Sequence, residues 1–532
     1  MNTDKHILDT IIPLVGNVNK QFVKEYDGHH FPLDSEVLER LQKLREKIGV
    51  GDDDFQIFRA KEDIMCLWGI LLRKSIECLR LFDKREPFLN HKDKMPFASG
   101  VKQLKEYFYE YSNFENLMYG GVEYYRDHLI HVFRVWLLGI KVLLTDDKKC
   151  LNNILIEKFY DVNDYEKLSM WTIIALTHDL GYPLEKASQI VDSTKKMMGA
   201  FVHNPILSMD LSFSGVQDSM NDYIVRFISS KMWEIDIESR HTIEADKEYE
   251  ELEKKNREEN ADRLDAYLTP KRYVARLQPK YYFKFQKSLE HNQHGILGTL
   301  IIYKLLLYFL ESDYSLNEDY LFDYEDSRQF YIRREILRAI ASHTCKDVYQ
   351  LSMKRFSFLL IIADDLQDWG RKGIAELYVP NSIKYNVDDV RFNFGEDVEK
   401  NVCDISDTYI YSKEGNMNQV SGVINAIERQ CRNYRAIFRD GQDTINRDFS
   451  FHKVTYLDLT AFNEKKYVID LSVSQEKPIM IQFRTELKDQ FTETEDNEGK
   501  KKYDNQVAQI FSDIFGKCTL VDNGNTIEYK LS

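Results

Sequence analysis

The chain has 532 residues, of which 43% are hydrophobic and 30% are charged. This length exceeds one ordinary domain and predicts roughly two to four domains with real cores. Acidic residues outnumber basic ones by 87 to 72, which gives a net charge of −15. A duplex-binding protein usually carries a basic surface, so nucleic acid is not the expected partner. Small anions stay compatible with this charge, because metals and local cations can reverse the field at one site.

The composition also bears on location and secondary structure. The chain has 10 prolines, which favours long helices over a loop-rich all-β fold. The 7 cysteines form no C-x-x-C pair and indicate reduced thiols in a cytoplasmic protein. The segment from Met1 to Lys20 contains no signal peptide. The most apolar stretch, Gly295 to Leu310, is interrupted by Lys304 and predicts a buried core helix in place of a membrane span.

Residues 1–118 are expected to form an N-terminal helical scaffold. Apolar stripes with helical spacing run through residues 34–118, and one of them comprises Leu38, Leu41 and Leu44. Asp34 and Ser35 precede this stripe and predict a helix cap. No spacing typical of catalysis occurs in this part, so we expect it to support the rest of the chain.

Residues 119–374 continue the helical pattern and are expected to form the main core, with a charged insertion at about 190–290. Residues 238–265 are almost purely charged and polar, which is typical of a solvated helix or a mobile arm. In residues 270–291, basic side chains alternate with aromatic ones. This stretch predicts either a lid that guides an anionic substrate or stacks a base, or the exposed half of a helical hairpin whose aromatic rings pack inward.

After residue 375 the pattern changes to short alternating runs, such as KVTYLDLTAF and KYVIDLSV, which predict strands. Helical stretches fall near 417–438 and 503–515, and the runs CTLVDN and TIEYKL predict closing strands. This order of elements favours a ferredoxin-like or related α+β module over residues 375–532. Such a module beside a catalytic core would either bind a regulatory ligand, for example a nucleotide, or form a homo-oligomer interface.

A His-Asp pair lies in the segment WTIIALTHDLGYP, residues 171–183. The apolar run before the pair predicts a buried helix, which Gly181 and Pro183 end. His178 and Asp179 are therefore expected in a final turn that opens into a cleft. Because a carboxylate has two oxygens, Asp179 can bind one metal ion with each oxygen and bridge the two ions.

Further His and Asp residues flank apolar helical segments in the same region. His128 and His131 lie one turn apart, and either could reach a metal ion. His294 begins an apolar helix, His343 ends another, and an Asp pair ends a Leu/Ile run. Buried acids after such a run are costly unless they are paired or bound to metal. The ordered series predicts a binuclear metal centre that consists of His131, His178, Asp179, His294, His343 and Asp364.

This series resembles the HD-domain superfamily of metal-dependent phosphohydrolases, in the subset that holds two metals. Members place the first histidine in an H-x-x-x-V context. His131, which is followed by Val135, fits this context better than His128 does. They end on Ala-Asp after an apolar helix, which fits Asp364 and makes Asp365 an outer or surface residue. The resemblance covers about residues 120–374.

The resemblance implies an HD-type helical core, two divalent metal ions (Mn, Fe, Mg or similar) and a small phosphorylated substrate, a nucleotide or a related phosphoester. A metal-bound hydroxide would attack that substrate. The residues implied for one ion are His131, His178, Asp179 and Asp364, and those for the other are Asp179, His294 and His343. We assign catalytic roles to Asp179 and Lys186. Candidate phosphate clamps that bind the substrate are Arg126, Lys186 and Arg371.

Departures from the family pattern leave alternatives open. Deoxynucleotide triphosphohydrolases of the superfamily carry a His-rich stretch after the HD pair, where this chain has GYPLEKAS. Cyclic-dinucleotide phosphodiesterases of the HD-GYP type carry Gly-Tyr-Pro in a separate, later motif, so the GYP after this HD pair does not assign the chain to them. A few proteins with the same ligand order are di-iron oxygenases, which keeps redox chemistry open. A nuclease that acts on single strands through residues 270–287 is a further alternative, against which the net charge argues.

Overall fold

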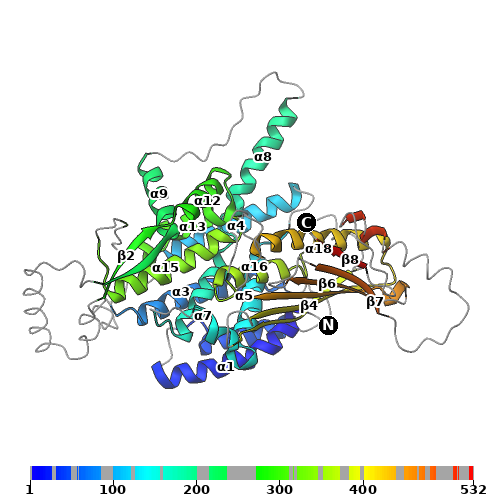
Figure 1. Cartoon of the computed structure of the whole chain (residues 1–532), viewed down its shortest axis with the longest axis horizontal. Coiled ribbons are helices and arrows are strands. Elements are labelled where there is room, and N and C mark those ends of the chain that lie inside the picture. The colour runs from blue at the N-terminus through cyan, green and yellow to red at the C-terminus, as the bar shows by residue number, and fades with distance from the viewer. Residues whose placement is uncertain are drawn as a thin grey trace, which may run out of the picture.

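The structure, a computed structural model, describes residues 3–26, 31–48, 57, 59–84, 100–121, 126–155, 160–199, 215–236, 271–310, 316, 320–345, 352–371, 383–395, 401–438, 449–463, 466–473, 480–486, 507, 509–511, 513–514 and 527–530. It is mainly helical, with a mixed sheet in its C-terminal part (Figure 1). The expected fold class is confirmed at this level, as a helical protein with a C-terminal module that contains both helix and sheet. No described helix is both long and apolar enough to cross a membrane.

The N-terminal helices carry the apolar stripes that the sequence predicts. They are α1 (Thr3–Tyr26), α2 (Ser35–Ile48), α3 (Lys61–Leu81) and α4 (Val101–Gly121). Asp34 caps α2, because its side chain accepts a hydrogen bond from the Val37 N–H at 3.1 Å. The buried positions of α2 include Leu41 and Leu44, which face the neighbouring helices.

The central helices carry the candidate ligands. They are α5 (Leu129–Leu144), α7 (Asp164–Thr177), α13 (His294–Leu305), α15 (Tyr324–Ser342) and α16 (Phe356–Leu366). Between them lie α8 (Tyr182–Met198), α9 (Gly215–Ser229) and the short helices η3 (Asp146–Lys148), α6 (Lys149–Asn153) and α14 (Leu307–Leu310). The N-terminal helices join this core, since α1 packs against α5 and α3 against α7.

Local hydrogen bonds fix where two of the central helices begin. At the start of α7, the Asn163 side chain accepts from the Glu166 N–H at 2.9 Å, and the Glu166 side chain accepts from the Asn163 N–H at 3.1 Å. At the start of α15, Asp323 accepts from the Asp326 N–H at 2.8 Å. These caps set the register of both helices, and so the positions of the histidines that follow their last turns.

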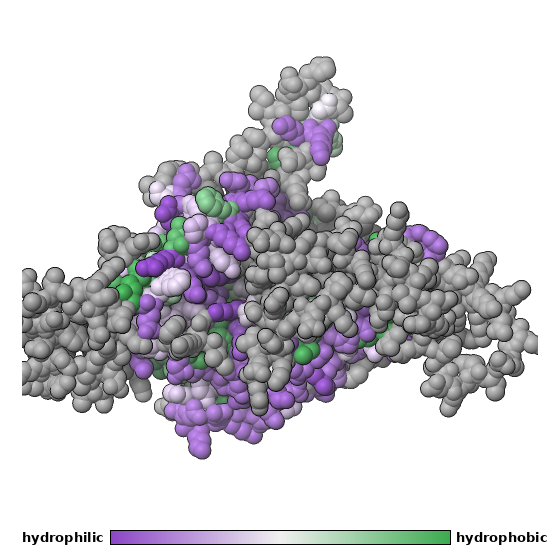
Figure 2. Space-filling view, in the orientation of Figure 1, coloured by the Kyte–Doolittle hydropathy of each residue, from purple (hydrophilic) through white to green (hydrophobic). Residues whose placement is uncertain are grey.

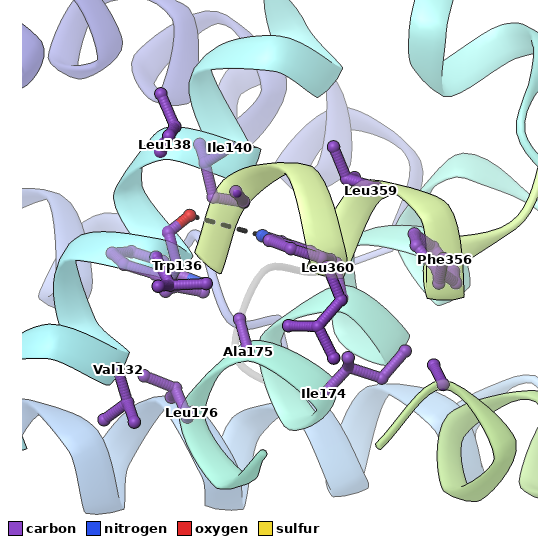
Figure 3. Close-up of a cluster of buried hydrophobic side chains, with 14 of the residues drawn as sticks. Val132, Trp136, Leu138, Ile140, Ile174, Ala175, Leu176, Phe356, Leu359 and Leu360 are labelled. Atoms are coloured by element: carbon purple, nitrogen blue, oxygen red, sulfur yellow. Dashed lines mark hydrogen bonds between the residues drawn. The ribbon is translucent and has the colours of Figure 1, made fainter. Parts of the chain in front are cut away.

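A layer of buried side chains from α5, α7 and α16 fixes these helices against one another (Figure 3). Gly139 of α5 permits the closest approach, because a Cβ there would lie 1.9 Å from the Trp171 ring. The Trp171 indole N–H donates to the Trp136 carbonyl at 3.2 Å, the dashed line in Figure 3. Helices held this closely have little freedom to slide, which keeps the ends that carry the candidate ligands in place.

A β-hairpin lies within the expected charged insertion. β1 (Ser230–Asp236) pairs with β2 (Lys271–Leu277), and α12 (Pro279–Glu290) follows. The helical hairpin expected over 270–291 is therefore wrong for its first half. The backbone of 271–277 pairs residue by residue with 230–236 in antiparallel register, which makes it a strand and not a helix. Residues 238–265 lie outside the described residues.

The C-terminal module contains a six-stranded sheet whose described strands follow chain order. The strands are β3 (Ile383–Asn393), β4 (Val402–Tyr411), β5 (Ser450–Asp458), β6 (Lys466–Val473), β7 (Met480–Glu486) and β8 (Ile527–Lys530). Helix α18 (Met417–Phe438) joins β4 to β5, and the short α19 (Thr460–Asn463) precedes β6. The expected helix near 503–515 is present at the described residues 507, 509–511 and 513–514, and the strand expected at 518–523 lies outside the described residues.

The connection through α18 decides the topology of this module. β4 and β5 are parallel direct neighbours, paired from Val402↔Ser450 to Ile410↔Asp458, and the other described neighbours are antiparallel. A ferredoxin-like sheet is built from split βαβ units, in which a further strand separates the parallel pair. The ferredoxin-like expectation is thus not confirmed, whereas the α+β character of the module is.

Candidate metal centre

The six predicted ligands lie at helix ends that meet in one place. His131 is in the first turn of α5, His294 is the first residue of α13, and Asp364 is in the last turn of α16. His178 and His343 directly follow α7 and α15 as their C-terminal caps, and Asp179 comes next to the first of them. Apolar helix interiors thus position polar side chains that project from the helix ends.

Asp179 lies at the middle of this group, with a different pair of histidines at each oxygen. Its Oδ2 atom is 3.6 Å from the Nε2 atom of His131 and 3.6 Å from that of His178. Its Oδ1 atom is 3.3 Å from the Nε2 atom of His294 and 3.6 Å from that of His343. The carboxylate therefore divides the site into two halves, each with two ring nitrogens.

Asp364 completes the half that contains His131 and His178. Its Oδ1 atom lies 2.8 Å from the Nε2 atom of His131 and 3.8 Å from that of His178. Ligand atoms of His131, His178 and Asp364 lie within 4.8 Å of one another, as do those of His178, Asp179 and His343. All six ligands predicted from the sequence therefore lie together.

Each of the four histidines has its other ring nitrogen held by an oxygen acceptor. These pairs are His131 with Gln367 Oε1, His178 with the Ala175 carbonyl at 2.9 Å, His294 with Glu185 Oε2 at 2.7 Å and His343 with the Ile340 carbonyl at 2.6 Å. An acceptor at Nδ1 places the proton there and leaves the Nε2 lone pair for a metal ion. All four Nε2 atoms lie 3.3–3.6 Å from an oxygen of Asp179.

Two of the Nε2 atoms are buried without a hydrogen-bond partner. Within the described part of the chain, this holds for His178 and His343, whose side chains are 0% and 1% exposed. Buried polar atoms are almost always satisfied, so a pair of orphaned ring nitrogens beside a carboxylate indicates a missing partner. A divalent cation suits nitrogen and carboxylate donors of this kind, and the donor set fits two such ions.

The carboxylates of the site are ionised because imidazoles surround them. Burial opposes the charge, but His178, His294 and His343 hold the pKa of Asp179 well below its usual range. In the same way, His131 and His178 outweigh burial and hold the pKa of Asp364 well below its usual range. Both carboxylates are therefore ionised at neutral pH and can bind cations.

The imidazoles respond in opposite directions. Burial lowers the pKa of His131 and of His343, so both rings favour the neutral form that binds metal. At His294, Asp179 and Glu185 overcome the effect of burial and raise the pKa to about 9. A metal ion bound at His294 therefore has to displace a proton near neutral pH.

Two glycines allow the backbone to bring His294 to the others. A Cβ at Gly181 would lie 2.2 Å from the His294 carbonyl, and one at Gly295 would lie 2.7 Å from the Ile340 carbonyl and 3.0 Å from His343 Nδ1. Distances this short are not tolerated, so α13 packs on the ends of α7 and α15 only because these positions lack side chains. Gly181 was expected to end the preceding helix, and its lack of a side chain also allows α13 to pack closely.

The predicted phosphate clamps occupy three different environments. Arg126 forms an ion pair with Asp368 and is tied to a carboxylate. Lys186 lies over the Tyr182 ring, 5.0 Å from its centroid, and 3.6 Å from Glu185. Arg371 is close enough to lower the pKa of His131, after the larger effect of burial.

Arg371 is the clamp candidate best placed to meet an anion. Its Nε atom is buried and has no hydrogen-bond partner among the described residues. It follows Gly370, whose φ of +67° turns the chain after Trp369 and α16. The guanidinium thus adds positive charge beside the His131 half of the site.

His128, the alternative first ligand, has another role. Its ring stacks on Tyr182 with centroids 3.8 Å apart, and its backbone N–H donates to Glu115 Oε1 at 2.6 Å. Tyr182 in turn meets the His294 ring edge-on, with centroids 5.4 Å apart. The preference for His131 over His128 agrees with this geometry.

Three side chains around the centre were missed in the sequence. Glu185 accepts from the His294 backbone N–H at 2.9 Å as well as from its ring, Gln367 holds His131, and Tyr182 packs between two histidines. Gln367 lies three positions after Asp364, which is a spacing that could have indicated it. Glu185 and His294 are 109 positions apart, and no local pattern joins them.

Comparison with protein-family models, curated proteins and solved structures finds no match to this chain.

Proposed function

We propose that this protein is a metal-dependent phosphohydrolase of the HD type, acting on a nucleotide or a related phosphoester. The observation that carries the proposal is the position of Asp179, whose two oxygens each face two histidine Nε2 atoms. A single bridging carboxylate with nitrogen donors on both sides is the donor pattern of a binuclear hydrolytic centre. The order of the ligands along the chain, which resembles the HD-domain superfamily, supports the same conclusion.

The residues that would hold each ion follow from the two halves of the site. His131, His178 and Asp364 lie on the side of Asp179 Oδ2, and His294 and His343 lie on the side of Oδ1. Two divalent ions bound here would supply an activated water and charge that offsets the negative charge of a phosphoryl group.

The side chains around the centre would orient and bind the substrate. Arg371 places a cation next to His131, and its buried Nε–H is available for a phosphate oxygen. Lys186 is held over the Tyr182 ring at the His294 side, where its charge would attract the same anion. Arg126 is engaged by Asp368, so we assign it a smaller part in binding than the sequence suggested.

The experiment is a hydrolysis assay of the full chain with Mn²⁺ or Fe²⁺ against nucleotides, cyclic dinucleotides and generic phosphoesters. His178→Ala and Asp179→Ala should each abolish turnover and lower the bound metal, because both remove ligands. Asp365→Asn is the matched control, since this acid adjoins Asp364 but is not part of the ligand groups; it should retain both. Activity that survives the loss of both His178 and Asp179 would falsify the assignment.

The same assay separates hydrolysis from oxygenase chemistry with the same ligands. Turnover sustained by redox-inert Mg²⁺ or by Mn²⁺ without oxygen supports a hydrolase. A strict requirement for iron together with oxygen consumption would replace the proposal by a di-iron oxygenase.

A further inference from the structure

The β1–β2 hairpin has one face that is rich in cations. Directly opposed residues of an antiparallel pair share a face, and so do alternate residues along a strand. The register opposes Lys231 to Arg276, Trp233 to Val274, and Ile235 to Arg272. These six side chains therefore lie on one side of the hairpin, which we call the outer face. Val274 is buried there at 1% exposed, whereas Lys231, Trp233 and Arg276 are exposed.

The other side of the hairpin packs on the protein and includes Glu234. Met232, Tyr273 and Ala275 belong to the hydrophobic core, so they define the inner face. Glu234 opposes Tyr273 in the register, and burial together with the charge of Glu234 raises the pKa of Tyr273 to about 12. Lys231, Arg272 and Arg276 thus lie on the outer face, whereas Glu234 lies on the inner face.

Trp233 is held open in the middle of the outer face. Its side chain is 48% exposed, although an indole ring gains more from burial than most side chains do. The Lys231 ammonium lies 5.3 Å from the ring centroid, and the Arg276 guanidinium lies 5.8 Å from it. Cations at these distances stabilise the ring in its exposed position.

Helix α12 repeats this combination directly after β2. Phe283 and Lys284 lie three and four positions after Lys280 and four and three positions before Lys287, so the four residues form one stripe of the helix. Phe283 is 69% exposed, whereas Phe285 on the opposite side is fully buried. Figure 2 shows apolar residues set among hydrophilic ones over β2 and α12.

We propose that the outer face of the hairpin and the stripe of α12 bind single-stranded nucleic acid. Exposed rings on which bases stack, flanked by cations that neutralise the phosphates, are the two elements by which proteins hold unpaired strands. Bases in a duplex are already stacked on one another, so they are not free to cover Trp233 and Phe283. The whole chain carries a net charge of −15, but this surface is positively charged. The net charge of the chain therefore does not argue against nucleic-acid binding at this surface.

The position of this surface connects it with the metal centre. Helix α12 has 12 residues and so spans about 18 Å, and three residues separate its end from His294. A nucleic-acid strand bound along α12 would run toward His294, one of the predicted metal ligands. Binding of the nucleic acid needs no metal ion. A failure to bind can therefore be distinguished from a failure of the proposed hydrolysis.

The test measures fluorescence anisotropy of a labelled short oligonucleotide, as single-stranded DNA, single-stranded RNA and blunt duplex, with the full chain in EDTA at low salt. We expect the single strands to bind more tightly than the duplex. Trp233→Ala and Phe283→Ala should each weaken binding about tenfold, because each removes one stacking surface. Trp233→Tyr keeps a ring and should retain most of the affinity.

Charge variants report separately on the phosphates. Arg272→Ala and Arg276→Ala should each reduce the slope of log Kd against log salt by about 0.7, while Trp233→Ala leaves the slope unchanged. Tyr109→Ala is the control for an exposed ring elsewhere, since Tyr109 on α4 is 60% exposed, and Lys43→Ala on α2 is the control for an exposed lysine. Circular dichroism confirms that each variant is folded.

Three outcomes would overturn the proposal. One is that the unmodified protein binds no single strand at low salt. Another is that duplex, heparin or polyglutamate binds as tightly as the single strand and Trp233→Ala has no effect, which would indicate a general polyanion surface or an acidic protein partner. The third is that the Tyr109 and Lys43 controls weaken binding as much as the variants of the hairpin and of α12.

Discussion

Glu185 acts on the metal centre through a single ligand. One of its oxygens accepts from both the backbone N–H and the ring Nδ1–H of His294, at 2.9 and 2.7 Å. These bonds fix the rotation of the ring and keep its Nε2 atom toward Asp179 Oδ1. Outer carboxylates of this kind also raise the basicity of the imidazole that they hold.

We therefore expect Glu185→Ala to weaken the binding of the ion at the His294 half. A loss of about 10- to 100-fold in affinity is typical when such a partner is removed. The measurement is metal content and affinity by chelator competition. Glu185→Gln keeps an acceptor oxygen and should lose less, and Glu39→Ala, an exposed helix residue paired with Lys43, should lose nothing. Equal affinity in Glu185→Ala and the unmodified protein would mean that the ring of His294 is held by other contacts.

His452 places a titratable group in the C-terminal sheet. Its Nε2 atom lies 3.0 Å from Asp470, and its Nδ1 atom lies 3.6 Å from Asp404. The hydrogen bond to Asp470 is the largest cause of a pKa raised above the ordinary value of 6.5, and burial opposes it. The ring is 43% exposed, so solvent screens these interactions.

A raised pKa makes the contribution of His452 to stability depend on pH in one direction. The contribution is fully present below the ordinary value of 6.5 and is lost as the pH rises through the higher value of the folded state. In urea titrations across this range, His452→Asn should lower the free energy of unfolding most at acidic pH, and the difference should shrink as the pH rises. Asp470→Asn removes the same partner and should flatten the profile in the same way. A deficit that is constant with pH would contradict this prediction.

At the scale of the elements, the candidate metal centre depends on how closely two helix ends approach. The start of α13 meets the end of α15 at Gly295, where a Cβ would lie 2.6 Å from Thr344 Oγ1 and 2.7 Å from the Ile340 carbonyl. Both atoms are anchored, because the Ile340 carbonyl accepts from His343 and Thr344 accepts from the Gly295 N–H. Neither can move without displacing a ligand.

Gly295→Ala should therefore cost stability and metal affinity together. We expect a loss of about 1–3 kcal/mol in the free energy of unfolding, as for other overpacked positions. Gly422→Ala is the matched control, because Gly422 lies in α18 and a Cβ there would meet nothing within 4 Å. There the gain in helix propensity should be neutral or stabilising by up to about 1 kcal/mol. Urea denaturation and metal analysis of the two variants check this, and equal effects of both would show that close packing at Gly295 is unimportant.

At the scale of the whole molecule, a buried ion pair ties the first helix to the core. Asp4 of α1 accepts from two nitrogens of Arg134 on α5, at 2.9 and 2.6 Å, and from the Trp369 indole at 2.8 Å. All three side chains are at most 1% exposed. Arg134 also donates to the Trp369 carbonyl, so the pair fixes the segment that leads to Arg371.

Asp4→Asn should destabilise the protein by about 3–5 kcal/mol, because it leaves the Arg134 charge buried without compensation. Asp9 lies on the same helix and pairs with Arg45 at an exposed position, where both side chains are about 40% exposed. Asp9→Asn should therefore change stability by only about 0–1 kcal/mol. Thermal or urea unfolding distinguishes the two. Similar small effects of both substitutions would mean that α1 is not needed to hold the core.

The C-terminal module is also joined to helix α16 through a chain of polar contacts. Asp407 of β4 pairs with Lys453 of β5 at 2.9 Å, and Lys453 donates to Gln430 of α18 at 2.7 Å. Gln430 in turn donates to the Asp365 carbonyl at 3.1 Å, next to Asp364. The sheet and the last ligand helix are thus joined by hydrogen bonds as well as by apolar packing.

The candidate ligands could be named from the sequence because each of them lies at the end of an apolar helix. The pattern of His131, the His178-Asp179 pair and Asp364 is visible without knowing how the helices pack. The remaining features depend on contacts between distant parts of the chain. Arg126 pairs with Asp368 across 242 positions, and Glu185 meets His294 across 109.

The fold, too, was predictable where it depends on local sequence pattern. Helical spacing and alternation give the element types in the N-terminal and C-terminal parts. The β1–β2 hairpin was missed because β2 is short and basic, and its partner strand lies on the other side of a polar segment. The direct parallel pairing of β4 and β5 depends on the path of α18, which local pattern does not determine.

The two residues that share the closest contact between ligands in this centre, His131 and Asp364, are 233 positions apart. During synthesis, no nascent chain that ends before the last ligand contains a complete site. Contacts between residues this far apart in the sequence form late in folding, because long loops have to close first. A metal ion therefore cannot guide the early stages of folding, and its uptake would report that the helical core has closed.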